Sequence, residues 1–202
     1  MASPENIIET ASKLSIVLKK AGIAHAIIGG AAGNLLGSER STQDVDVLVT
    51  PPAIQVREAI LRNSDRFTVA PNMKLVHTSE SGTIVPIEIL KDGPEATLRM
   101  PELSSTPILE VDQIPVVHPS MLICMKLNRW SWMSESTRDQ SRVKADNDRH
   151  DIMFMLHWLA EKGEKITFEG VEVDRRERHM EGLRKLRSEY EEADELLKSV
   201  LD

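Results

Sequence analysis

Apolar residues recur at helical spacing in two stretches of the first half of the chain. Ser3 and Pro4 suit the N-cap and the first position of a helix, and apolar side chains then repeat every three or four residues as far as Gly22. The second stretch follows Pro51-Pro52, and its apolar positions are Ile54, Val56, Ile60 and Leu61. Both stretches are predicted to be helices, because a glycine or a proline marks a boundary of each.

Short apolar or alternating runs between these helices predict strands. The runs are 24–28, 44–49, 67–70, 74–78, 83–90 and 114–118. Gly29-Gly30 follows the first run directly and precedes a short helix of small residues that Gly37 ends. The tripeptide DGP at 92–94 is a strong break, and residues 94–106 are predicted to be irregular.

After residue 118 the pattern is helical throughout. The predicted helices are 119–130, 148–158 and 174–202. The polar stretch 134–147 is predicted to be a loop or a frayed helix. The last helix is charged, and we expect it either to cap its own chain or to pair with a second copy. The change of pattern predicts an α+β protein, with a mixed sheet flanked by helices over 1–118 and a helical region over 119–202.

The composition is that of an ordinary globular chain. Of 202 residues, 41% are hydrophobic and 28% are charged, which excludes a fully disordered protein. No apolar run reaches the roughly 18–20 residues that a membrane span needs, and no basic segment precedes an apolar one at the N-terminus, so we expect a cytoplasmic protein with no membrane partner. The single cysteine, Cys124, excludes an internal disulfide framework and is expected to be a buried, inert thiol.

Charge and aromatic content restrict the partners. The net charge is −7, from 25 basic and 32 acidic residues, whereas proteins that grip a nucleic-acid duplex through its phosphates are usually basic. Aromatic residues make up only 3%, which disfavours a stacking platform for single strands. A nucleotide or a short RNA end stays compatible, because a few basic residues can converge in one cleft.

Three acidic residues lie in predicted strands. Asp44 and Asp46 alternate with valines, so both side chains would point to one face of a strand. Two carboxylates this close repel unless a cation lies between them, and hard oxygen ligands favour Mg²⁺ or Mn²⁺. Glu88 lies between two isoleucines and therefore needs a partner or a cleft. If the two strands pair, the acids form a site for two metal ions about 4 Å apart; for Asp-x-Asp alone, the alternative is a solvated strand end.

Four further residues are candidates for phosphate binding. Gly29 and Gly30 lie at a helix start, where backbone N–H groups can hold a phosphate and a glycine lets it approach. Arg40 lies in the loop before the acids, and Lys126 lies in the apolar helix after residue 118. The alternatives are a tight turn for the glycines, a solvated arginine for Arg40 and a snorkelling surface lysine for Lys126.

The order strand, Gly-Gly, short helix and G-x-x-R-x-T-x-D-x-D resembles nucleotidyltransferases of the DNA polymerase β type, in particular the minimal, antibiotic-modifying and toxin–antitoxin branches. The motif residues are Gly29, Gly30, Gly37, Arg40, Thr42, Asp44 and Asp46. Glu88 matches the third acid of the family, which is usually Asp. A less specific similarity continues to about residue 160 and involves Lys126, Lys144, Asp148 and Asp151.

The resemblance implies a metal-dependent transfer of a nucleoside monophosphate from a nucleoside triphosphate, with ATP as the expected donor, to a hydroxyl group. The triphosphate would lie at the Gly-Gly turn, one metal ion would be held by Asp44 and Asp46, and a second would also use Glu88. The acceptor would be a small molecule, an RNA end or a protein side chain. Two alternatives stay open: a catalytically silent binding or antitoxin-like module with the same fold, and a sugar-nucleotide glycosyltransferase, for which the 43 residues before Asp44 are few.

Overall fold

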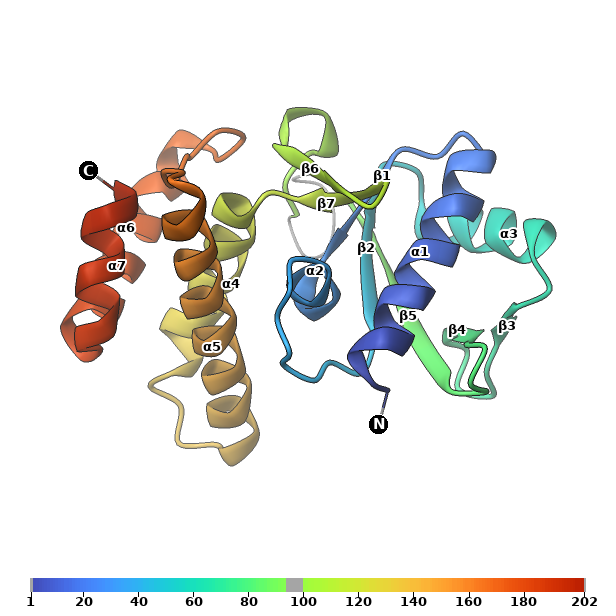
Figure 1. The fold of residues 1–202 in the computed structure, drawn as a ribbon, viewed down its shortest axis with the longest axis horizontal. Coiled ribbons are helices and arrows are strands. Elements are labelled where there is room, and N and C mark those ends of the chain that lie inside the picture. Colours follow the sequence, from blue (N-terminus) through green and yellow to red (C-terminus); the bar gives the residue numbers. More distant parts are fainter. Residues whose placement is uncertain (1, 94–99, 202) are drawn as a thin grey trace. The chain divides into compact units, whose positions relative to one another are not determined.

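The computed structural model describes residues 2–93 and 100–201, and the chain forms two compact units. Unit 1 is Met1–Val117 and unit 2 is His118–Asp202 (Figure 1). All strands among the described residues belong to unit 1, and unit 2 is built of helices. The predicted α+β fold, with a mixed sheet and a helical C-terminal part, is confirmed.

Unit 1 is organised around a seven-stranded sheet with the order β3-β4-β5-β2-β1-β7-β6. The strands are β1 His25–Ile28, β2 Val45–Val49, β3 Phe67–Val69, β4 Leu75–Thr78, β5 Ile84–Lys91, β6 Ile108–Val111 and β7 Ile114–Val117. The pairs β2–β5 and β1–β7 are parallel, and the other pairs are antiparallel. The central strands β1 and β2 are almost wholly buried, which explains their apolar sequences.

Among the described residues of unit 1, four helical segments accompany this sheet. They are α1 Pro4–Lys20, α2 Gly29–Leu35, α3 Ala53–Asn63 and the 3₁₀ helix η1 Leu103–Ser105. Ser3 caps α1 as predicted, since its hydroxyl accepts a hydrogen bond from the Asn6 N–H. Helices α1 and α3 pack against each other and against the sheet. The apolar face predicted for α3 is partly wrong: Val56 and Ile60 are buried, but Ile54 is 51% exposed.

Strand β6 was missed by the hydrophobic pattern. It pairs with β7 as a tight antiparallel hairpin, in which Asp112 and Gln113 both have positive φ angles of 48° and 65°. Such turns are usually signalled by Asn-Gly or Asp-Gly, and this one has no glycine. Ile108 of β6 is 40% exposed, because the strand lies at the edge of the sheet.

Unit 2 consists of four helices over its described residues. They are α4 Pro119–Met133, α5 Asp139–Lys162, α6 Val173–Glu189 and α7 Glu191–Leu201. Of the two alternatives for 134–147, the loop is wrong from Asp139 onward, because α5 begins there as a helix. Its helical pattern is weak in the sequence, since only the later turns of α5 carry a broad apolar face. Helix α4 is well buried, and burial raises the pKa of Cys124 to about 12, as expected for an inert thiol.

The tail is not the single helix that its charged pattern predicts. Tyr190 has an extended backbone, with φ −134° and ψ 112°, and separates α6 from α7. Its ring lies 6.5 Å from the Trp130 ring, and the Arg149 guanidinium lies 4.9 Å above it. The break lets α7 pack its buried Leu197 and Val200 against α5 and α6, which a continuous helix would not allow.

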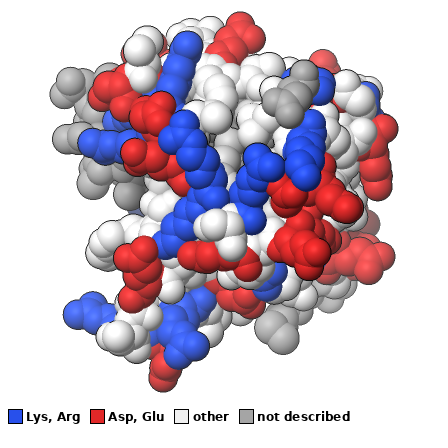
Figure 2. Space-filling model, turned by 90° about the vertical axis from the view of Figure 1, so that its left-hand side faces the viewer, with Lys and Arg blue, Asp and Glu red and all other residues white. Residues whose placement is uncertain are grey.

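Charges of both signs share the exposed surface. Lys, Arg, Asp and Glu side chains lie next to one another on the face drawn in Figure 2. In unit 2, Arg184 pairs with Glu177 at 2.8 Å and Lys185 with Glu135 at 2.7 Å. Among the residues that the structure describes, no helix is both long enough and apolar enough to cross a bilayer.

Candidate functional site

The register of two parallel strands brings three carboxylates together. In the β2–β5 pair, Asp46 and Glu88 are direct partners, and Asp44 immediately precedes β2. One carboxylate oxygen of each residue lies within 4.8 Å of the other two. Asp44 and Asp46 are half-buried and Glu88 is exposed, so the group opens to solvent on the Glu88 side. Three negative charges therefore converge at one point of the sheet of unit 1.

The electrostatics of this acid cluster favour a bound cation. At a separation near 4.8 Å, each pair of carboxylates repels by roughly 1–3 kcal/mol, depending on how strongly water screens the pair. A divalent ion between the oxygens replaces this repulsion with attraction. The donor set is all oxygen and carries three negative charges, which suits hard divalent ions such as Mg²⁺ and Mn²⁺. The residues present therefore fit the metal ions that the motif predicts.

Gly29 lies against the Asp46 carboxylate. It follows β1, whose last residue Ile28 pairs with Asp46, and its φ angle is +68°. A Cβ atom at Gly29 would lie 2.2 Å from Asp46 Oδ2 and 3.1 Å from Cγ. No side chain fits in that space, and the positive φ angle favours glycine independently. The carboxylate of Asp46 thus occupies the volume that any larger residue would need.

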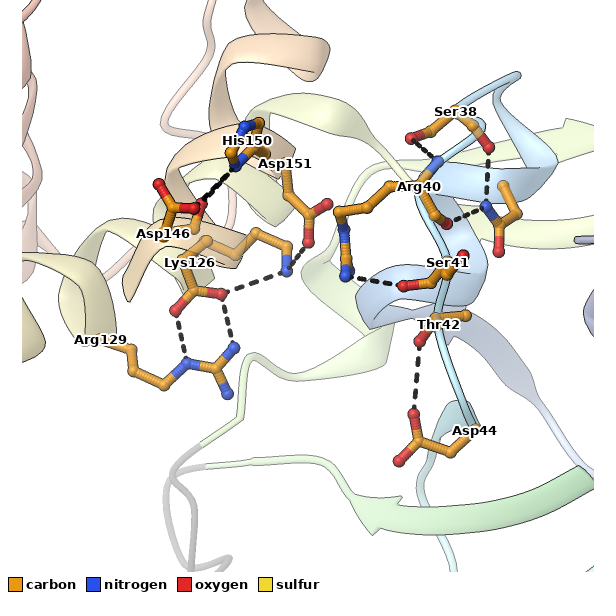
Figure 3. A network of polar contacts seen from close by, with 12 residues as sticks. Ser38, Arg40, Ser41, Thr42, Asp44, Lys126, Arg129, Asp146, His150 and Asp151 are labelled. Carbon is orange, nitrogen blue, oxygen red and sulfur yellow. Dashed lines mark hydrogen bonds and ion pairs between the residues drawn. The ribbon is translucent and has the colours of Figure 1, made fainter. Parts of the chain in front are cut away.

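Gly30 makes room for the loop that precedes the acids. A Cβ atom there would lie 2.6 Å from Thr42 Oγ1 and 2.9 Å from Arg40 Nη2. Thr42 is buried, and its hydroxyl donates a 3.5 Å hydrogen bond to Asp44 Oδ1 (Figure 3). The structure therefore brings Gly29 against the acid cluster, and Gly30 against Arg40 and Thr42 of the loop that leads to it. Contacts with side chains of unit 1 account for both glycines, and their phosphate-binding role stays a prediction.

The loop 38–42 is held by a residue that the sequence did not single out. Asn34 of α2 is 4% exposed, and its Nδ2 donates to the carbonyl oxygens of Ser38 at 2.7 Å and Arg40 at 2.9 Å. The Arg40 N–H donates to Ser38 Oγ at 3.3 Å, and Arg40 Nη1 donates to the Ser41 carbonyl at 3.0 Å (Figure 3). The only sequence signal for Asn34 is a polar residue in a helix of small apolar ones.

Lys126 lies in a buried network of charges in unit 2. Its Nζ is 2.6 Å from Asp151 Oδ2 and 3.5 Å from Asp148 Oδ1, and the lysine is only 8% exposed. Arg129 donates through Nε and Nη2 to the two oxygens of Asp148, at 2.6 and 2.5 Å (Figure 3). The surface-lysine alternative is therefore wrong. The phosphate-binding role of Lys126 stays a prediction, because the charge that it would offer already has two carboxylate partners.

The other positions of the downstream similarity separate into two sets. Asp148 and Asp151 are buried beside Lys126, as described, whereas Lys144 is exposed on α5. His150 is also exposed and makes a 2.8 Å hydrogen bond through Nδ1 to the Asp146 carbonyl. Arg129, which completes the buried network, was missed, although it lies three residues after Lys126 on the same helix.

Comparison with solved structures identifies the fold. The chain matches an antigenic nucleotidyltransferase-like protein from Paracoccidioides brasiliensis with a TM-score of 0.72 and 18% identity, over 99% of this chain and 95% of that one. The solution structure of the antibiotic-resistance factor ANT(2'')-Ia matches with a TM-score of 0.46 and 13% identity, over 89% of this chain and 92% of that one, which is too weak to carry an argument. Neither a protein-family model nor a curated protein sequence matches the chain. The chain thus has a nucleotidyltransferase-like fold, and the resemblance predicted from the motif is confirmed at that level.

Proposed function

We propose that the protein is a metal-dependent nucleotidyltransferase that moves a nucleoside monophosphate from a nucleoside triphosphate to a hydroxyl group. The observation that carries this proposal is the meeting of Asp44, Asp46 and Glu88 within 4.8 Å in a nucleotidyltransferase-like fold. An acid cluster alone is common on protein surfaces. Here Gly29 leaves space for one of the three acids and Thr42 bonds another, so the cluster is supported by its surroundings.

In this proposal Asp44 and Asp46 hold one Mg²⁺ or Mn²⁺ ion, and Glu88 joins them in holding a second. Bound ions of this kind supply positive charge for the phosphate oxygens and lower the pKa of a bound hydroxyl. Arg40 contacts the triphosphate from the loop beside the cluster, with ATP as the expected donor. The half-buried position of Asp44 and Asp46 limits the water around the ions, which strengthens these electrostatic contacts.

The reaction is an in-line displacement at the α-phosphorus. The acceptor oxygen forms a new bond to phosphorus, the bond to the bridging oxygen breaks, and pyrophosphate leaves with that electron pair. Glu88 takes the proton of the acceptor hydroxyl, since it is the exposed member of the cluster and an incoming acceptor reaches it from solvent. The acceptor itself is a small molecule, an RNA end or a protein side chain.

Transfer of label tests the proposal directly. The protein is incubated with each α-³²P-labelled nucleoside triphosphate, with Mg²⁺ or Mn²⁺, and with a cell extract as the source of acceptors. We expect a labelled product that Asp44→Asn with Asp46→Asn abolishes, whereas Asp65→Asn, an exposed acid elsewhere in unit 1, leaves it unchanged. Nucleotide binding without any labelled product would instead favour the silent binding module.

A further inference from the structure

Asn34 makes an unusual set of contacts for a residue in a short helix. Its neighbours Ala31, Ala32 and Gly33 are small and buried, and Asn34 is buried with them. Both N–H groups of its amide donate to carbonyl oxygens of the loop 38–42, those of Ser38 and Arg40. Two carbonyl oxygens can only be bonded by the nitrogen end of the amide, so this orientation follows from chemistry.

The other end of the amide shows that packing does not explain the residue. Asn34 Oδ1 is buried and has no hydrogen-bond partner among the described residues. A buried polar atom without a partner is unfavourable, and leucine, which has as many side-chain heavy atoms, would fill the space without it. The asparagine therefore contributes through its two donated hydrogen bonds, and these bonds fix the path of the loop.

The fixed loop carries the residues that flank the acid cluster. Arg40 and Thr42 occupy the space that a side chain at position 30 would need, and the Thr42 hydroxyl donates a hydrogen bond to Asp44. The Asn34 bonds end on the carbonyl of Arg40 itself and on that of Ser38, two residues earlier. Together with the backbone bond from the Ser38 N–H to the Gly33 carbonyl at 2.9 Å, they tie the loop to α2 at two successive points.

We infer that Asn34 is a positioning residue, which holds the loop so that Arg40 lies against Gly30 and Thr42 bonds Asp44 before any nucleotide arrives. The part of the inference that concerns the nucleotide rests on the proposed function. The part that concerns the loop does not, because the two hydrogen bonds exist in the protein alone. The two parts are tested by separate measurements.

Hydrogen–deuterium exchange without ligand tests the loop. Asn34→Ala removes both donors, and Asn34→Asp keeps the shape but replaces the donors with a carboxylate that repels the two carbonyls. We expect both variants to raise the exchange rate of the amides in residues 38–42 about tenfold. Each of the two hydrogen bonds stabilises the loop modestly in the wild-type protein, and both are lost. Asn63→Ala is the matched control, since it removes an exposed amide that bonds one carbonyl, Ala59 O at 2.8 Å. Wild-type exchange in Asn34→Asp would overturn the inference.

Binding of Mn²⁺ and of Mn²⁺ with ATP tests the consequence. We expect Mn²⁺ affinity alone to change less than about twofold in Asn34→Asp, and affinity for ATP with Mn²⁺ to fall about tenfold. Arg40→Ala should cause a similar fall, and the double variant Asn34→Asp with Arg40→Ala should fall no further, since both act through one guanidinium. A purely structural role would give additive losses, which would overturn the inference. A wild-type protein that binds no ATP would refute the proposed function, and the exchange measurement would still decide the loop.

Discussion

Gly29→Ala should disturb the acid cluster directly, because the added methyl group meets one of the three acids. The new Cβ atom would lie 2.2 Å from Asp46 Oδ2, against a normal contact of more than 3.4 Å. Backbone shifts cannot relieve this easily, because Gly29 follows β1, whose last residue Ile28 is the register partner of Asp46 in the sheet. The Asp46 side chain must therefore leave its rotamer.

The magnitude has two separable parts. An alanine at a positive φ angle costs about 1–2 kcal/mol of unfolding free energy whatever surrounds it. Displacing Asp46 adds about 0.5–1.5 kcal/mol for an unfavourable rotamer, which gives a total of about 1.5–3.5 kcal/mol. Mn²⁺ affinity should also fall, by roughly 10–100-fold, the range typical when the support of a metal ligand is lost.

Gly22 provides a matched control for the backbone part. Its φ angle is +69°, against +68° for Gly29, and a Cβ atom there would meet nothing within 4 Å. Gly22→Ala should therefore lose about 1–2 kcal/mol and keep its Mn²⁺ affinity. Urea unfolding of both variants and titration with Mn²⁺, followed by electron paramagnetic resonance, measure the two quantities.

A third variant isolates the clash. With Asp46→Ala as the background, the two nearest atoms are gone and only Cβ of residue 46 stays, at 3.3 Å, so Gly29→Ala should cost less than in wild type and approach the cost of Gly22→Ala. Equal costs for Gly22→Ala and Gly29→Ala in the wild-type background, with unchanged Mn²⁺ affinity, would refute the reasoning. The Asp46 carboxylate would then not lie against Gly29 in solution.

Three other outcomes follow from the same structure. Without metal, Asp44→Asn with Asp46→Asn should raise the melting temperature or leave it unchanged, because the repulsion between the carboxylates is relieved. The same double variant should lose the stabilisation by Mn²⁺ with ATP. A strong loss of stability without metal would mean that the acids are structural. In unit 2, Asp148→Asn should destabilise by about 1.5–3 kcal/mol, because a buried carboxylate loses its charge-assisted bonds while Lys126 keeps Asp151 and the half-exposed Arg129 keeps water. Exposed Asp146→Asn should change urea unfolding by less than about 1 kcal/mol. His77 is buried, and burial lowers its pKa below the ordinary 6.5. Below about pH 6.5 the unfolded chain therefore binds a proton at His77 while the folded chain does not, so the free energy of unfolding should fall as the pH drops. Between pH 8 and pH 5 the free energy of unfolding should fall less in His77→Leu than in wild type. An equal dependence on pH in the two proteins would contradict the assignment of this effect to His77.

The acid cluster was predictable because two simple periodicities determine it. Alternation along β2 directs Asp44 and Asp46 to one face, and an acid between isoleucines in β5 needs a polar surrounding. The pattern does not say which strands pair, so the meeting of Asp46 and Glu88 depended on a guess about topology. The structure supplies that register directly.

The elements that the sequence misplaced lack a local signal. The β6–β7 turn uses Asp112-Gln113 without glycine, and the start of α5 is too polar to show a helical face. The break at Tyr190 depends on contacts with Trp130 and Arg149, which are distant in sequence. Tertiary packing decides each case, and no window of neighbouring residues contains that information.

Helix α2 shows how the two kinds of information combine at the candidate site. At seven residues, with glycine at positions 29, 30 and 33, it is too short and too flexible to be stable alone. Its composition is explained by its surroundings. Gly29 leaves space for the Asp46 carboxylate, and Gly30 leaves space for Thr42 and Arg40. Asn34 donates hydrogen bonds to the loop 38–42 that carries these two residues. The helix therefore supports the acid cluster on one side and the loop on the other. Since its own stability comes from these contacts, substitutions that weaken α2 should alter the site before they unfold the unit.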